Sequence, residues 1–599
     1  MSDQSGNRRR LLPAAQSRWE TVFPIVTTLR GYRREDFGHD LVAGTVVAVL
    51  TIPQAIAYAF LAGLPAEAGL YACMVPMVIY ALMGSGREVV VGPVAIAALM
   101  VSSAVGEYAE AFSYRYLSIT TTLAIEVGAL LMLLKWLRMS GIVNLLSHPV
   151  IVGFVNAAAI LIILSQLEAV FGISVPGTDS LFAEAFYIVG HLSEANAATF
   201  SLAILALGVM LFVSRFSVPL LRHIFPSLPD AHPVNRVGPM VATIVGVVLV
   251  AVFSLDQTYD VRVVGAVPAG LPPLTWPVLE FQLWIELLPT AAMIGLVAFV
   301  ETYSIGTTLA SRHRRRVNPD QELLALGAAN VAAALTGAYP VAGSFSRSSV
   351  NVSAGARTNV STLVCFLGIA ATLLWFTPLF HFLPHAVLGV IIIASVLTLV
   401  DFTALRHQWH FNRRDAFINV GTLVAVLTFD VEAGLVIGIF ISVALLIHRS
   451  SRPHIAIVGR IGTSEHFRNI ERHDVETFPH VIAVRIDGSI YFANARHIEN
   501  FLMQIVAERW ELEHLVIVCS PVNFIDSSGL EMLDRVTRNL AALGIDVHLA
   551  EVKGPVMDQL ETTDFIRRLS GKIYFTTDQA MRDLENFSPG KSDPSETNV

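Results

Sequence analysis

The sequence predicts a polytopic α-helical membrane protein followed by a small α/β domain, and two observations support this. The 599-residue chain is 54% hydrophobic and 15% charged, whereas a soluble globular domain carries about 25% charged residues. The shortage of charge covers residues 41 to 446, and charged residues return at soluble density from about Pro453. We therefore expect a cytosolic segment at 1–40, a transmembrane domain at 41–450, a cytosolic domain at 454–587 and a disordered tail at 588–599.

Apolar segments of about 20 residues match the hydrocarbon core of a bilayer. The chain contains about 14 such segments, at 41–62, 69–84, 94–105, 116–137, 142–166, 197–214, 236–254, 286–306, 319–337, 344–353, 358–378, 382–400, 414–428 and 430–448. Two of them, 94–105 and 344–353, are too short to cross as plain helices. The first 19 residues are polar and Arg-rich, so we expect no cleavable signal peptide.

The distribution of positive charge gives the orientation. If the N-terminus is inside, the inside connections hold Arg87, Lys135, Arg138, Arg215, Arg222, Arg312, Arg314–Arg316, Arg357, Arg406, Arg413 and Arg414. The outside connections hold little beyond Arg115 and Arg262. Because cytosolic loops are enriched in Lys and Arg, we expect a multi-pass protein of the inner (plasma) membrane with both termini in the cytosol.

The two short segments resemble each other. "VVGPVAIAALM" and "YPVAGSFSRSSVN" lie about 250 residues apart, as the third and tenth predicted spans, and each places Gly and Pro before a short helix. Broken helices at matching positions of two halves are typical of transporters built from inverted repeats. Fourteen spans then divide into two repeats of seven, and the odd number inverts the second repeat.

A half-helix that begins inside the membrane exposes unpaired N–H groups and a partial positive charge at its N-terminus. Two such ends facing each other predict an anion site. Ser344 and Ser346 offer hydroxyl donors and N-caps for the second half-helix. Arg347 adds a full charge and, because Arg in hydrocarbon costs about 2.5–3.5 kcal/mol, should face a polar cavity. The alternative is an interfacial Arg that reaches outward to the headgroups.

Three long motifs resemble the sulfate permease (SulP) family: "IPQAIAYAFLAGLPAEAGLYACMVPMVIYALMGSGREVVVGPVAIAAL", "SHPVIVGFVNAAAILIILSQL" and "NPDQELLALGAANVAAALTGAYPVAGSFSRSSVNVSAGART". The resemblance covers nearly the whole chain. It implies a fourteen-span fold in which a core domain holds the anion and moves against a gate domain. It also implies a cytosolic STAS domain at the C-terminus and a homodimer.

The resemblance places the anion between the N-termini of the third and tenth helices. Carried over by motif, the substrate-binding residues are Gln54, Tyr58, Val94, Ala95, Ser344, Phe345, Ser346 and Arg347. The amide of Gln54 can donate, and Tyr58 offers a ring wall with a hydroxyl. For either residue alone, packing between helices is the alternative.

Glu301, in "VAFVETYSIGTT", is the expected ion-coupling residue. A carboxyl group beside an anion site can bind a proton as the anion binds, which gives symport. A structural salt bridge with Arg347 is the alternative, and protonation would then release the arginine. Sodium-coupled relatives tend to carry Asp at this position, so Glu301 favours protons, although Thr302 and Ser304 could still serve sodium.

From about His454 the chain alternates short β-runs with amphipathic helices, which predicts a small α/β sheet domain. "NFIDSSGLEML" resembles the STAS signature of bacterial anti-sigma-factor antagonists, in which the first hydroxyl after the Asp is phosphorylated. That position is Ser527, a candidate regulatory phosphosite. The alternative is that Asp526 and Ser527 only cap the following helix.

We expect a secondary active transporter of a small oxyanion, foremost sulfate with protons. Sodium- or proton-coupled transport of bicarbonate or a dicarboxylate by the same fold is the alternative, and a membrane receptor with STAS output is a distant one. The sequence has no G-x-x-x-x-G-K-[ST] motif, nucleophile–base pair or metal-ligand spacing. We therefore expect no ATP-driven pump, enzyme, cofactor, metal or nucleic-acid partner.

Overall fold

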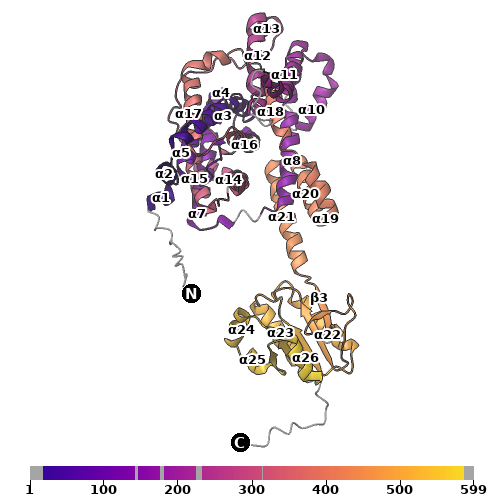
Figure 1. Ribbon diagram of the computed structural model, residues 1–599. Helices are drawn as coiled ribbons and strands as arrows, with labels where there is room; N and C mark the ends of the chain where they lie inside the picture. Colours follow the sequence, from indigo (N-terminus) through magenta and orange to yellow (C-terminus); the bar gives the residue numbers. More distant parts are fainter. Residues whose placement is uncertain are drawn as a thin grey trace, which may run out of the picture. The chain divides into compact units, whose positions relative to one another are not determined.

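The computed structural model describes residues 18–141, 146–175, 181–223, 233–312, 314–462 and 464–585 (Figure 1). The predicted tail at 588–599 and the first part of the segment at 1–40 lie outside the described residues. The chain divides into two compact units, Met1–Ile441 and Ser442–Val599. The division falls within α21 (Val431–Ser450).

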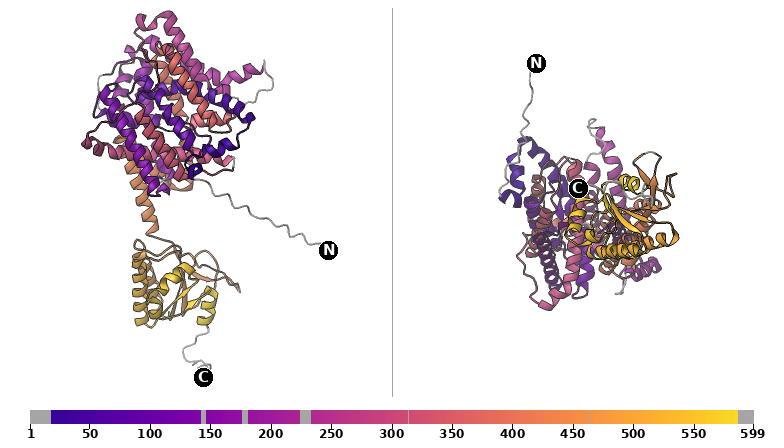
Figure 2. Two further views of the ribbon diagram at one scale, coloured as in Figure 1. Left: turned by 90° about the vertical axis from the view of Figure 1, so that its left-hand side faces the viewer. Right: turned by 90° about the horizontal axis from the view of Figure 1, so that it is seen from below.

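The first unit is helical and is seen from two further sides in Figure 2. Its main helices are α1 (Arg18–Val22), α2 (Ile25–Arg30), α3 (Arg34–Leu61), α4 (Ala66–Ala72), α5 (Val75–Met83), α6 (Ala95–Gly106), α7 (Tyr114–Trp136), α8 (His148–Ser165), α9 (Leu167–Phe171), α10 (Leu181–Gly190), α11 (Ala197–Arg222), α12 (Gly238–Phe253), α13 (Leu255–Thr258), α14 (Phe281–Arg312), α15 (Pro319–Leu335), α16 (Phe345–Ser353), α17 (Val360–Ala371), α18 (His385–Leu397), α19 (Phe402–Phe411) and α20 (Arg413–Thr428).

These helices pack in two groups (Figure 1). The core group comprises α3–α7 and α14–α17, with α7 packed on α15 and α14, and α3 packed on α17. The gate group comprises α8–α12 and α18–α20, with α8 packed on α20, and α11 packed on α12 and α18. Helix α3 also contacts α12 and α18 of the gate group, so it lies where the two groups meet.

Small residues allow the tightest helix contacts of this unit. A Cβ atom on Gly128 of α7 would lie 2.7 Å from the carbonyl oxygen of Gly327 of α15. One on Gly44 would lie 2.3 Å from the carbonyl oxygen of Ser361, where α3 meets α17. Membrane helices gain no hydrophobic free energy by leaving lipid, so close backbone approach is a main source of their association.

Each of the fourteen predicted apolar segments overlaps a helix of this unit or α21. Within the described residues, nine helical segments are long and apolar enough to cross a bilayer. The two predicted short helices are indeed short, with 12 residues in α6 and 9 in α16. The number of membrane crossings therefore stays a prediction. Helices α10 and α19 were not predicted, because they lie in connections and are only 10 residues long.

The second unit contains a six-stranded sheet with strand order β4-β3-β5-β6-β7-β8. Its strands are β3 (Ile455–Arg460), β4 (Phe467–Asn469), β5 (Val481–Ile486), β6 (His514–Val518), β7 (Asp546–Ala550) and β8 (Ile573–Tyr574). The run from β5 to β8 is parallel, whereas β3 pairs antiparallel with both β4 and β5. The parallel pairs are joined through α22 (Ala495–Glu508), α23 (Ser527–Ala542) and α24 (Gly554–Glu561) with α25 (Phe565–Arg568).

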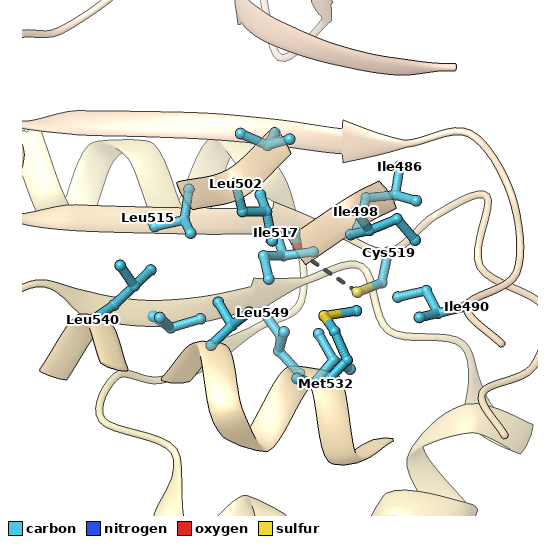
Figure 3. Close-up of a cluster of buried hydrophobic side chains, with 14 of the residues drawn as sticks. Ile486, Ile490, Ile498, Leu502, Leu515, Ile517, Cys519, Met532, Leu540 and Leu549 are labelled. Carbon is cyan, nitrogen blue, oxygen red and sulfur yellow. Dashed lines mark hydrogen bonds between the residues drawn. The ribbon is translucent and has the colours of Figure 1, made fainter. Parts of the chain in front are cut away.

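Each face of this sheet has its own core. Side chains of β5, β6 and β7 pack with α22 and α23 on one face, as Figure 3 shows for Leu515, Leu502 and Met532. Alternate residues of the same strands pack on the other face against α26 (Thr577–Glu585) through Met581 and Leu584. The predicted α/β alternation is confirmed, because strands covered on both faces are apolar on both faces.

Two buried histidines lie on neighbouring strands of this sheet. His548 of β7 accepts a hydrogen bond at Nδ1 from the backbone N–H of Lys572, at 2.9 Å. Its proton must then be on Nε2, which lies 3.2 Å from Nδ1 of His514 on β6. Burial, followed by the electrostatic effects of His514 and Lys572, lowers the pKa of His548 to about 4. The folded domain therefore holds His548 neutral.

We predict that the sheet loses stability as the pH falls from about 6.5 to about 4, because the unfolded chain then binds a proton that folded His548 does not. The limiting slope is about 1.4 kcal/mol per pH unit for one proton. Hydrogen exchange of β6 and β7 amides in the whole protein, corrected for the intrinsic rate, measures it. His548→Asn keeps an acceptor near Lys572 and cannot titrate, so an equal slope in this variant would contradict the assignment.

Candidate functional site

A two-stranded ribbon joins the two broken segments of the first unit. Strand β1 (Val91–Gly92) pairs antiparallel with β2 (Ala342–Gly343), and the N–H of Ser344 donates to the carbonyl of Val90 at 3.1 Å. Each strand leads into a half-helix, β1 into α6 and β2 into α16. Because the strands are antiparallel, the helices leave the ribbon in opposite directions. Both N-terminal ends, with their unpaired N–H groups, therefore lie beside the ribbon.

Side chains from other elements satisfy the irregular backbone around the ribbon. Asn330 of α15 accepts from the N–H of Val341 at 2.9 Å and donates to its carbonyl at 3.1 Å. The N–H of Gly343 donates to the hydroxyl of Thr302 on α14 at 2.8 Å. The N–H of Val90 donates to the hydroxyl of Ser348 at 2.9 Å. Non-helical backbone inside a membrane requires such partners, because lipid supplies none.

The half-helix ends hold six predicted site residues, namely Val94, Ala95, Ser344, Phe345, Ser346 and Arg347. Ser344 is the N-cap of α16 and accepts from the N–H of Arg347 at 3.5 Å. Val94 is the N-cap residue of α6 without a side-chain cap bond, and Ala95 begins the helix. Both residues are buried. The capping role predicted for Ser344 thus matches the structure, whereas Ser346 lies within the first turn of α16.

Arg347 ties one broken helix to the other. Its side chain is fully buried, and Nη2 donates to the carbonyl oxygen of Pro93 at 2.7 Å. Nη1 lies 4.0 Å from Sγ of Cys73, and Nε has no hydrogen-bond partner among the described residues. No ion pair within 4.0 Å joins Arg347 to Glu301 in the described part of the chain. The arginine therefore points inward under the ribbon rather than outward to headgroups.

A cavity of about 340 Å³ lies between the core and gate groups. Its polar lining consists of Gln54, Arg236, Ser346, Ser349, Ser395 and Thr398. Gln54 of α3 donates to the hydroxyl of Ser395 of α18 at 3.4 Å, and Arg236 donates to the hydroxyl of Ser349 of α16 at 3.1 Å. Tyr58 is buried one turn beyond Gln54 on α3. Arg347 was expected to face a polar cavity, but it is not among these lining residues.

Glu301 lines a second, smaller cavity of about 220 Å³. The other lining residues are mainly apolar, among them Ile96, Phe154 and Val300. One carboxylate oxygen of Glu301 is buried without a hydrogen-bond partner among the described residues. Phe345, the first residue of α16, lines this cavity and the larger one. Among the predicted site residues, Glu301 therefore lines only the smaller cavity, whereas Gln54 and Ser346 line only the larger one.

The sequence did not single out Arg236, Ser349, Ser395 or Asn330. Arg236 ends a short 3₁₀ turn, Pro233–Arg236, in a connection between helices. A single arginine in such a connection forms no sequence motif that would indicate a binding site. The small polar residues lie singly within apolar helices. Their partners are distant in sequence, with 341 positions between Gln54 and Ser395, so no local motif could have indicated them.

Ser527 lies on the second unit as the first residue of α23 and is exposed. The N-cap is Asp526, whose carboxylate accepts from the N–H of Gly529 at 2.8 Å and from the N–H of Phe492 at 2.9 Å. Asp526 therefore caps α23, as the alternative interpretation of the motif expected. Ser527 is the first residue of the helix, and it is exposed to solvent.

The comparisons with known proteins cover nearly the whole chain. Residues 37–422 match the Sulfate permease family, and residues 472–580 match the STAS domain. The protein named probable sulfate transporter 4.2 of Arabidopsis thaliana is 33% identical over 568 residues, which are 93% of this chain and 82% of the relative. High affinity sulfate transporter 2 of Stylosanthes hamata is 30% identical over 593 residues, which are 97% of this chain and 88% of the relative.

Solved structures share the fold at lower identity. Murine Solute Carrier 26 family member A9, an anion transporter in the inward-facing state, superposes with a TM-score of 0.86 at 21% identity, covering 97% of both chains. The transmembrane domain of a cyanobacterium bicarbonate transporter, BicA, gives 0.58 at 23% identity over 67% of this chain and 98% of that one. The chain therefore has the helical membrane-transporter fold predicted from its sequence, ends in a STAS domain, and belongs to the sulfate permease family.

Proposed function

We propose that this protein is a secondary active transporter that takes up sulfate with protons across the inner (plasma) membrane. The observation that carries the proposal is the ribbon, which brings two half-helix N-termini and Arg347 together. The N-termini of the two half-helices and the guanidinium group all favour binding of a negatively charged ligand beside the ribbon. Relatives at 33% and 30% identity are named sulfate transporters, which supports sulfate as the anion.

In this proposal the anion binds between α6 and α16. Backbone N–H groups at Val94, Ala95, Phe345 and Ser346 donate to it, and Ser344 holds the first turn of α16. Gln54 and Tyr58 form the wall contributed by α3. Arg347 supplies positive charge from beneath the ribbon, and Arg236 meets the anion at the mouth of the larger cavity. Sulfate has four acceptor oxygens, so a cradle of several donors suits it.

Glu301 carries the coupling proton in this proposal. Its cavity is largely apolar and one of its oxygens lacks a partner, so its environment favours the neutral form. Sodium is the less favoured ion because the hydroxyl of Thr302 already accepts from Gly343 and donates to the carbonyl of Ala298, at 2.8 and 2.6 Å. Of the two hydroxyls considered for sodium, only Ser304 remains beside Glu301 in the cavity.

Transport requires the core group to move against the gate group, because the larger cavity lies between them. The hydrogen bonds from Gln54 to Ser395 and from Arg236 to Ser349 join the groups and must break in that movement. We place the transmembrane domain at 41–450 and the cytosolic STAS domain at 454–587, with both termini in the cytosol. Homodimer formation and phosphorylation of exposed Ser527 complete the proposal as regulatory features.

Bicarbonate or a dicarboxylate is the second candidate cargo. Helix termini and one arginine attract any compact anion, and these features contain no group that selects sulfur over carbon. Coupling of this second cargo would use protons or sodium.

We predict that Arg347→Ala lowers sulfate affinity by at least about tenfold, because it removes a buried charge whose hydrogen bonds are worth about 1.5–3 kcal/mol each. Equilibrium binding of radiolabelled sulfate to purified protein measures this. Arg215→Ala removes an exposed arginine of α11 and should bind as wild type. Unchanged affinity in a folded Arg347→Ala protein would remove Arg347 from the site.

We predict that Glu301→Gln binds sulfate but no longer depends on a pH gradient, because the amide cannot exchange a proton. Glu126→Gln is the matched control. Glu126 is also buried in the membrane domain with both oxygens unpartnered among the described residues, but it is not among the residues lining either cavity. Uptake measured with and without a gradient should separate the two variants. Gradient-driven uptake by Glu301→Gln would exclude the proposed role.

The function itself is tested by radiolabelled sulfate uptake into proteoliposomes with an alkaline interior and no sodium, competed by bicarbonate and by fumarate. Uptake that collapses with the gradient supports proton-coupled sulfate transport. Absence of sulfate uptake, together with sodium-driven uptake of labelled bicarbonate, would overturn sulfate as cargo and favour the second candidate.

A further inference from the structure

A third cavity lies in the first unit, beside α2 and the start of α3. It measures about 380 Å³, and its charged and phenolic lining consists of Tyr32, Asp36, Arg87, Glu88, Arg315 and Arg357. It does not include Arg347, Glu301 or Gln54. Three of these six residues are arginines from separate connections, so the fold, rather than one basic stretch, gathers this positive charge.

Two buried carboxylates hold the loops that carry Arg87 and Arg357. Glu322 of α15 accepts from the N–H and hydroxyl of Ser85, from the N–H of Gly86 and from the hydroxyl of Tyr80, at 2.5 to 3.1 Å. This fixes the turn before Arg87. Asp40 of α3 accepts from the N–H groups of Arg357 and Thr358, at 2.7 and 3.1 Å, and from the Thr358 hydroxyl. The cavity wall is therefore preorganised, which reduces the entropy lost on binding.

The positive charge of the cavity is only partly neutralised. Arg315 pairs with Glu88 at 3.2 Å, and Arg357 pairs with Asp36 at 2.8 Å. Arg87 makes no ion pair or hydrogen bond with the described residues. Burial, followed by the neighbouring charge of Arg315, lowers the pKa of Arg87, and Glu88 acts in the opposite direction. Three guanidinium groups and two carboxylates leave one net positive charge and many unused N–H donors.

We propose that this cavity binds a phosphate monoester, separately from the transported anion. A guanidinium fork matches two oxygens of a phosphoryl group, and the monoester has three terminal oxygens to share among Arg87, Arg315 and Arg357. The monoester can come from a lipid headgroup or from a soluble metabolite. Exposed apolar side chains nearby on α1 to α3, namely Trp19, Leu29 and Phe37, would place the cavity near the bilayer interface.

Binding to the whole purified protein tests the proposal with two matched probes, phosphatidic acid in phosphatidylcholine nanodiscs and soluble sn-glycerol 3-phosphate. We expect saturable binding of at least one probe, and Arg87→Gln to weaken it by about tenfold or more. Arg316→Gln removes an exposed arginine next to Arg315 that does not line the cavity, and it should bind as wild type. Binding of the lipid alone identifies a lipid headgroup as the source of the monoester. Binding of both probes shows that a soluble monoester is also accepted.

A second measurement uses the unaltered chain, so that it does not depend on a variant folding. Bound probe should protect Arg87, but not Arg316, from an arginine-selective dicarbonyl reagent, read by mass spectrometry of the peptides. Protection of Arg347 instead of Arg87, equal loss in both glutamine variants, or no binding of either probe would each overturn the proposal. None of these readouts measures transport, so failure of the proposed function would leave this result unaffected, and the reverse also holds.

Discussion

The membrane unit depends on one short backbone contact, the pairing of β1 with β2. Two residues on each side form it, yet it joins segments more than 240 positions apart and sets where α6 and α16 begin. Pairing satisfies polar backbone groups that lipid could not satisfy, and it leaves the N–H groups of the half-helices available. Asn330, Thr302 and Ser348 then hold the ribbon from three other helical positions. The electrostatic character of the site follows from this arrangement before any charged side chain is considered.

Arg347 strengthens the same arrangement in a way that its sequence context did not indicate. Its guanidinium donates to the carbonyl of Pro93, two residues before α6, so a side chain of the second half-helix bonds the chain that leads into the first. Gly92 makes room for this, since a Cβ there would lie 3.2 Å from Nη1 of Arg347. A buried guanidinium without a carboxylate partner among the described residues keeps the region positive. An ion pair with Glu301 would have neutralised it.

Much of the architecture could be predicted because local sequence patterns determine it. Apolar segments gave the helices, and Gly and Pro before short helices gave α6 and α16. The Ser344 N-cap followed from residue type. The β1–β2 pairing could not be predicted, because strands of two residues have no periodicity. The cavity residues Arg236, Ser349 and Ser395 were missed for a related reason: each is one polar residue whose partner comes from a distant helix. The same holds for Asp40, which bonds Arg357 across 317 positions.

Under the proposed function, Phe345 gives the coupling a physical route. Glu301 and the polar residues around Gln54 lie in different cavities, and Phe345 lines both. Phe345 is also the first residue of α16, where the proposed function has the backbone N–H groups of the half-helix bind the anion. An anion that draws the backbone N–H groups of α16 together therefore also moves Phe345, which borders the cavity of Glu301. Conversely, a neutral Glu301 removes a negative charge from the neighbourhood of those N–H groups. Proton and anion then favour each other through the helix end, without direct contact between carboxyl group and anion.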